Sequence, residues 1–132
     1  MSDAATSLQV RPSFVKLTVA DAEETEKFYA HVFGLVRDSA NDLPGFLEII
    51  LKSPDNGLGL VLMSYKKSLP LDPGNSWGPL GFDTNDLDAL TDRAVTAGAT
   101  VTMGPGKFEG TRYVFLKSPD GHQIELLQRG DG

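Results

Sequence analysis

A five-residue segment that occurs twice constrains this chain more than any other feature. Leu51–Asp55 reads LKSPD, and the same letters return at Leu116–Asp120 in a chain of 132 residues. Both copies read as the end of a strand followed by a tight turn, because proline already holds the backbone angle that the second turn position requires. Apolar stretches follow both turns, at 57–63 and 123–127, and predict core strands. The chain therefore contains an internal duplication.

The duplication also covers what lies before each repeat. Residues 14–21 align with residues 79–86, and in both segments an apolar strand runs into an acidic residue that can cap a helix. Each predicted helix ends at a glycine, Gly34 or Gly98. The order strand, helix, strand, strand, strand predicts an α+β fold of two βαβββ modules in tandem. They are expected to form one concave mixed sheet with the helices on its outer side.

The boundaries follow from composition and length. Module one is expected at about 12–64, a Pro- and Gly-containing linker at 65–78 and module two at about 79–128. A half of this size alone would be marginally stable, so residues 1–132 are expected to form a single domain with a shared core. The glycine-containing segment Gly104–Gly110 is expected to be a loop, either a lid at a pocket rim or a plain connection.

The bulk composition excludes several classes of function. A net charge of −6 argues against nucleic acid and against an anionic membrane surface as partners. No apolar run reaches the ~20 residues of a membrane span, and with no cysteine there is no thiolate metal site or disulfide. The N-terminal segment MSDAATSLQVR lacks the charged-then-apolar order of a signal peptide, so a cytoplasmic location is expected.

Alternation along the strands predicts which side chains face the concave side of the sheet. Leu47, Ile49 and Leu51, with Ile124 and Leu126, are expected to pack on the helices. The opposite face, together with nearby loops, is expected to bind a ligand through Phe14, Lys16, Phe46, Glu48, Val61, Met63, Trp77, Asp83, Phe108, Tyr113, Phe115 and Glu125. Its mixture of aromatic and polar groups suits a ligand-facing wall. Alternatively, each of these aromatic side chains packs in the core and does not contact a ligand.

Two longer stretches carry a resemblance to a known family. The opening VKLTVADAEETEKFYAHVFGL and the closing SPDGHQIELLQ resemble the vicinal oxygen chelate superfamily, which groups glyoxalase I, bleomycin-resistance proteins and extradiol dioxygenases. The resemblance covers roughly residues 12–128 and includes the duplication that the family shows. It implies the same fold of paired βαβββ modules.

The resemblance also implies where a metal ion would bind. Metal-dependent members place four ligands, usually His and Glu, at equivalent strand positions. Carried over, these positions are Phe14, Val61, Pro79 and Glu125, and only Glu125 has a donor atom. Of the two histidines, His31 is expected on the solvent-facing side of a helix and His122 in a turn. No cofactor is therefore expected, with a divalent metal ion kept as the alternative.

Three functional hypotheses follow. The leading one is a metal-free binding protein of the bleomycin-resistance type, a homodimer that holds a small aromatic molecule. The alternative is a glyoxalase-like lyase, isomerase or dioxygenase that uses a divalent metal or Glu125 as general base, with Tyr113 or Lys16 as the acid. If Glu125 has only a structural role, it is expected to form an ion pair with Lys16. A pure interaction module is the third hypothesis, so whether the chain is an enzyme stays open.

Overall fold

The computed structural model describes residues 8–55 and 57–130, and its elements repeat in the predicted order. Residues 1–7, which form most of the N-terminal segment that lacks the order of a signal peptide, lie outside this range. Module one consists of β1 (Phe14–Thr18), α2 (Ala22–Phe33), β2 (Val36–Asp42), β3 (Phe46–Lys52) and β4 (Gly59–Tyr65). Module two consists of β5 (Leu80–Asp83), α3 (Leu87–Thr96), β6 (Thr100–Phe108), β7 (Thr111–Lys117) and β8 (Gln123–Gln128).

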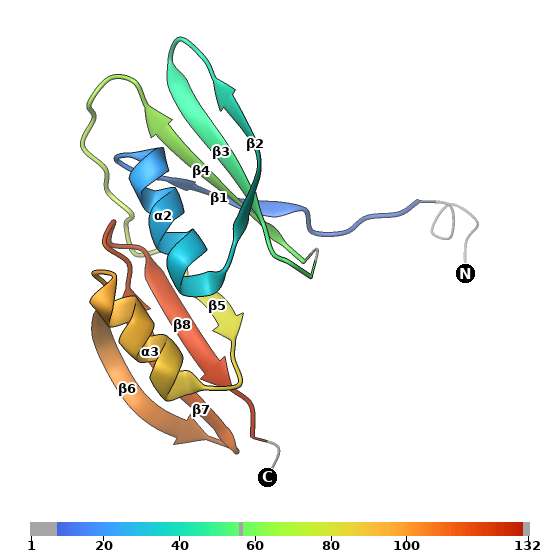
Figure 1. Ribbon diagram of the computed structural model, residues 1–132, viewed down its shortest axis with the longest axis vertical. Coiled ribbons are helices and arrows are strands. Elements are labelled where there is room, and N and C mark those ends of the chain that lie inside the picture. The colour runs from blue at the N-terminus through green and yellow to red at the C-terminus, as the bar shows by residue number, and fades with distance from the viewer. Residues whose placement is uncertain (1–7, 56, 131–132) are drawn as a thin grey trace.

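The strands form two four-stranded sheets, one from each module. Their orders are β1-β4-β3-β2 and β5-β8-β7-β6, with β1 parallel to β4, β5 parallel to β8 and the other pairs antiparallel. Figure 1 shows each helix lying across one face of the sheet of its own module. The α+β class and the tandem βαβββ modules are confirmed. The strands are divided between two sheets, because β1 and β5 are hydrogen-bonded only to β4 and β8.

One hydrophobic cluster joins the two modules and follows the predicted alternation. Ile49 and Leu51 of β3, and Ile124 and Leu126 of β8, are fully buried. Their alternate neighbours, such as Glu48 and Glu125, are only half-buried. Burying the apolar face of each sheet under a helix is the main source of stability here, and it leaves the opposite faces free for ligands.

Contacts between the modules come from the helix α2 and the second half of the chain. Phe33 of α2 stacks on Phe82 of β5 with ring centroids 3.9 Å apart. The hydroxyl of Thr25 donates to the Asp120 carboxylate at 2.6 Å, in the turn between β7 and β8. The second copy of the repeated turn therefore packs on the first helix. Neither helix among the described residues is both long and apolar enough to span a membrane.

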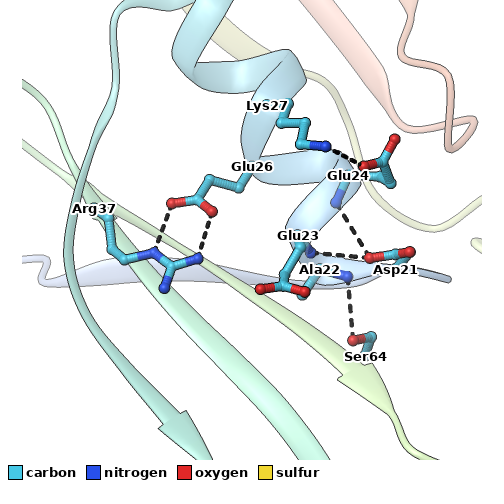
Figure 2. A network of polar contacts seen from close by, with 8 residues as sticks. All are labelled: Asp21, Ala22, Glu23, Glu24, Glu26, Lys27, Arg37 and Ser64. Carbon is cyan, nitrogen blue, oxygen red and sulfur yellow. Dashed lines mark hydrogen bonds and ion pairs between the residues drawn. The ribbon is translucent and has the colours of Figure 1, made fainter.

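The start of α2 is held by a local polar network, shown in Figure 2. The Asp21 carboxylate accepts hydrogen bonds from the backbone N–H groups of Glu23 and Glu24, at 3.1 and 3.2 Å. The hydroxyl of Ser64 on β4 accepts from the N–H of Ala22 at 3.1 Å. These bonds satisfy donors that an α-helix leaves free at its N-terminus. They fix α2 against the sheet of module one.

Replacing the capping residue tests this arrangement. Asp21→Ala is expected to lower the free energy of unfolding by about 1 kcal/mol, because two backbone donors lose their acceptor. Asp21→Asn, which keeps a side-chain oxygen, is expected to lose much less. Urea unfolding followed by circular dichroism measures both. Equal losses in the two variants would mean that the negative charge, and not the cap, stabilises the helix.

The predicted loop Gly104–Gly110 is the main correction to the secondary structure. Gly104–Phe108 belongs to the strand β6, and only Glu109 and Gly110 form the turn to β7. The Gly104–Pro105 peptide bond is cis, and the pairing of β6 with β7 shifts register twice between Val101 and Gly106. A proline is tolerated because β6 is an edge strand. This segment is therefore neither a lid nor a plain connection.

Candidate functional site

The open faces of the two sheets form two separate hollows. The first hollow, about 1040 Å³, lies on module one and includes Phe14 and Lys16 of β1, Glu48 and Ile50 of β3, and Val61 of β4. The second hollow, about 320 Å³, lies on module two and includes Phe108, Tyr113, Leu127 and Glu125. Most of the polar candidates predicted from the sequence therefore lie on these two surfaces. Within one chain they do not line one common cavity.

An ion pair crosses the first hollow. The Lys16 Nζ atom lies 2.6 Å from Glu48 Oε2. Asn41 of β2, which the sequence did not single out, donates to Glu48 Oε1 at 3.0 Å. The hydrogen bonds from Lys16 and Asn41 lower the pKa of Glu48 below its ordinary value. Glu48 is therefore a carboxylate at neutral pH, and Lys16 pairs with it and not with Glu125.

Glu125 occupies the corresponding place in module two. It lies on β8 between Phe115 of β7 and Gly81 of β5. A methyl group at Gly81 would meet no atom within 4 Å, so the surface is open at the β5 position that is paired with Glu125. Among the described residues no hydrogen bond or ion pair engages the Glu125 carboxylate. A half-buried carboxylate with free space beside it is suited to accept a proton from a ligand.

Two aromatic side chains, Tyr113 and Phe108, line the second hollow. Tyr113 packs edge to face on Phe115, which lies outside the lining, with ring centroids 5.7 Å apart. The Tyr113 ring lies so close to Gly106 that a methyl group there would come within 2.4 Å of its hydroxyl oxygen. Gly106 therefore makes room for Tyr113. Phe108, at the end of β6, is 68% exposed and contributes an apolar rim.

The other predicted site residues lie outside the two hollows. Phe46 and Met63 are half-buried on the open face of module one, and Asp83 is exposed and paired with Arg129 at 3.1 Å. Trp77 packs edge to face on His122 with centroids 5.6 Å apart, in a third hollow at the module junction. His122 is buried, which lowers its pKa. His31 is exposed, as expected.

The four positions that correspond to metal ligands of the resembled family do not form a metal site. Phe14 and Val61 face the first hollow, whereas Glu125 faces the second. The side chains of Phe14, Val61 and Pro79 have no donor atoms. No cluster of three His, Cys, Asp or Glu residues suited to a metal ion occurs among residues 8–55 and 57–130. The donor set at these positions therefore does not fit the metal of the family.

Comparisons with known proteins agree with the fold. Residues 11–126 match the family described as Glyoxalase/Bleomycin resistance protein/Dioxygenase superfamily. The chain is 32% identical over 118 residues to a Vibrio cholerae protein named "Probable lactoylglutathione lyase", covering 85% of this chain and 86% of that protein. A Salmonella typhimurium lactoylglutathione lyase is 28% identical over 121 residues, covering 87% of this chain and 90% of that enzyme.

A solved structure supports the same fold. Glyoxalase I from Zea mays superposes with a TM-score of 0.80 at 25% identity, covering 92% of this chain and 45% of the maize chain. The present chain thus spans about half the length of the maize enzyme.

These comparisons correct two predictions. The expected function as a metal-free binding protein is wrong, because relatives of about 30% identity are named lactoylglutathione lyase. The expectation that no cofactor is needed is wrong as well, because lactoylglutathione lyases and glyoxalase I are typically metal-dependent. The names also support the predicted small-molecule ligand, since lactoylglutathione is a small molecule. Phe14, Val61 and Pro79, whose side chains have no donor atoms, remain a difference between this chain and that class of enzyme.

Proposed function

The chain belongs to the glyoxalase/bleomycin resistance protein/dioxygenase superfamily, and from that premise we propose that it is a glyoxalase-like lyase. The observation that carries the proposal is the 32% identity to a protein named lactoylglutathione lyase over 85% of the chain. The proposed substrate class is a glutathione adduct of a small 2-oxoaldehyde. We further propose that residues 1–132 form a single domain, with module one at about 12–64 and module two at about 79–128.

The chemistry of this substrate class needs a base in the position of Glu125. The adduct of glutathione with a three-carbon 2-oxoaldehyde and the thioester lactoylglutathione are isomers. They differ in which of two adjacent carbon atoms carries a hydrogen and in which of the two attached oxygen atoms carries the hydroxyl hydrogen. A carboxylate can remove the proton from one carbon and return it to the other, while the hydroxyl proton leaves one oxygen and a proton is taken up by the other oxygen from the solvent. Glu125 has the open space beside Gly81 that a substrate carbon needs.

Tyr113 is the second group proposed to act at this site. Its ring lines the same hollow as Glu125, and its phenol is a donor that can hydrogen-bond to a carbonyl oxygen of the substrate. Phe108 and Leu127 supply apolar contact to the carbon chain. The proposed roles are thus proton transfer by Glu125, orientation by Tyr113 and exclusion of water by the apolar rim.

A turnover assay tests the proposal. The purified chain is mixed with glutathione and methylglyoxal, and formation of the thioester is followed by ultraviolet absorbance. We expect a rate at least about tenfold above the uncatalysed isomerisation, proportional to protein concentration. Parallel assays with added Zn²⁺ or Ni²⁺ and with a chelator measure the contribution of a metal ion. A rate equal to the protein-free control under all of these conditions would overturn the proposal.

We further propose that the chain works as a homodimer. Among the described strands, β1 and β5 each have one edge without a partner strand, and such edges are usually covered in a native assembly. Phe14 is 54% exposed on the first hollow and Phe108 is 68% exposed on the second. Placing the first hollow of one protomer against the second hollow of its partner would cover both rings and bring Glu125 opposite Lys16.

The oligomeric state is directly measurable. Size-exclusion chromatography with light scattering at micromolar concentration is expected to give twice the mass of one chain, which is 14.2 kDa. Replacing Phe108 by a charged residue, as in Phe108→Asp, is expected to shift the mass toward that of the monomer, because a charge would be buried at the interface. A monomeric mass for the unaltered chain would refute the dimer.

A further inference from the structure

Lys16 lies in the first hollow beside both apolar and charged side chains. Lys16 of β1 is paired in register with Val61 of β4, whereas Glu48 of β3 is paired with Met63 of β4. The ion pair between Lys16 and Glu48 therefore crosses β4 diagonally, between the Val61 and Met63 positions. Val61 is one of the positions where a metal ligand would be expected from the family. In this chain the residue paired with Val61 on β1 is the cationic Lys16.

Glu48 and Lys16 differ in how much hydrogen-bonding capacity they retain for a ligand. The side chain of Glu48 is 15% exposed and accepts hydrogen bonds from both Lys16 and Asn41. The side chain of Lys16 is 41% exposed. An ammonium group carries three donors, and one of them is directed to Glu48. The carboxylate is thus largely satisfied by the protein, while the partly exposed ammonium, on a residue that lines the hollow, retains donors for a ligand.

The rest of the hollow favours an anion as well. Arg11, Lys16 and Lys52 line it, against the two carboxylates of Asp38 and Glu48. Lys52 lies 3.3 Å from Asp38, so each of these carboxylates already has a cationic partner. This positive balance is local, because the whole chain has a net charge of −6. Apolar side chains adjoin these charges, namely Phe14, Ile50, Leu58 and Val61.

We infer that Lys16, anchored by Glu48, binds an anionic oxygen of the ligand in the first hollow. The ligand class is a small carboxylate, or a compound with a comparable ionised oxygen, attached to an apolar body that contacts Phe14 and Ile50. This inference rests on the proposed function and on the proposed dimer, in which the first hollow of one protomer lies against the second hollow, with Glu125, of its partner. It makes Lys16 a substrate-binding residue, where the sequence suggested an acid.

Binding of a simple probe tests the inference without any turnover. Benzoate combines a carboxylate with an apolar ring, and benzamide has nearly the same shape without the charge. In two-dimensional ¹H–¹⁵N NMR titrations of the full chain, benzoate is expected to bind at least about tenfold more tightly than benzamide. Shifts are expected on β1, β3 and β4. The preference is expected to shrink in high salt, because the side chain of Lys16 is partly exposed.

Substitutions test whether the preference for benzoate over benzamide depends on Lys16. Lys16→Met is expected to bind benzoate and benzamide equally, whereas Lys16→Arg keeps a positive charge and most of the preference. Lys27→Met is the matched control, because Lys27 is an exposed lysine on α2 that is also ion-paired, to Glu24. It should behave as the unaltered chain. An unchanged preference in Lys16→Met, or no preference in the unaltered chain, would overturn the inference.

The two proposals fail in different ways. Benzoate binding that depends on Lys16, in a protein with no isomerisation of the glutathione adduct, would support the inference and count against the lyase function. Isomerisation that is unaffected by Lys16→Met, with no preference for benzoate, would support the lyase function and contradict the inference. Glu48→Gln tests the direction of the charge effect. Removing the negative partner of Lys16 is expected to raise the affinity for benzoate, because the local positive charge increases.

Discussion

Glu125→Gln is expected to lower kcat for isomerisation of the glutathione adduct by at least about 100-fold, the scale of a lost general base. The amide has the shape of the carboxylate but cannot accept the proton. Glu125 is half-buried, and no described residue forms a hydrogen bond or ion pair with its carboxylate. The substitution should therefore leave the fold intact. Its effect should appear in kcat far more than in KM, because the lost interaction belongs to the transition state.

The controls for this prediction are stability and charge. The midpoint of urea unfolding should change little, since the carboxylate supports no structural contact. Glu23→Gln removes an equal charge from the exposed surface of α2 and should keep full activity. If Glu125→Gln retained more than about half of the activity, the base would have to be another group. Tyr113→Phe, which removes only the phenol oxygen, then distinguishes a role for Tyr113 from a role for Glu125.

The fold was largely predictable from the sequence because its signals are local. The repeated LKSPD turn and the period of two along each strand mark which residues enter the core, and Ile49, Leu51, Ile124 and Leu126 are buried as expected. The exception is β6. Gly104, Pro105 and Gly106 have the composition of a loop, but an edge strand can include a cis-proline and irregular pairing. Tertiary pairing with β7 overrides the local preference there.

The site was predictable only in part, because alternation assigns a side chain to a face but does not place the two faces relative to each other. Lys16, Glu48 and Glu125 all lie on open faces, as expected. Their partners depend on strand register: Lys16 reaches Glu48 two strands away in its own sheet, while Glu125 lies in the other sheet. The contribution of Asn41 also required the register of β2 against β3. Such non-local pairings leave no pattern in one sequence.

The missing metal ligands allow a prediction of gained function. Phe14→His, Val61→Glu and Pro79→His together would add three donors to Glu125 at the positions that correspond to the ligands of metal-dependent members. Two histidines and two carboxylates form a donor set that Zn²⁺ and Ni²⁺ accept. We expect the triple variant to bind Ni²⁺ at least about 100-fold more tightly than the unaltered chain, as measured by calorimetric titration of chelator-treated protein.

The stoichiometry of that variant also reports on the assembly. Positions 14 and 61 lie on the first hollow and Glu125 on the second, so within one chain the four donors do not converge. Tight binding of one Ni²⁺ per chain therefore requires two protomers to place these faces together. Adding Glu125→Gln to the triple variant should weaken binding by at least about tenfold, since it removes one of four ligands. If the triple variant gained no affinity while remaining folded and dimeric, the two hollows would not face each other in the dimer, and the proposed arrangement of the protomers would be wrong.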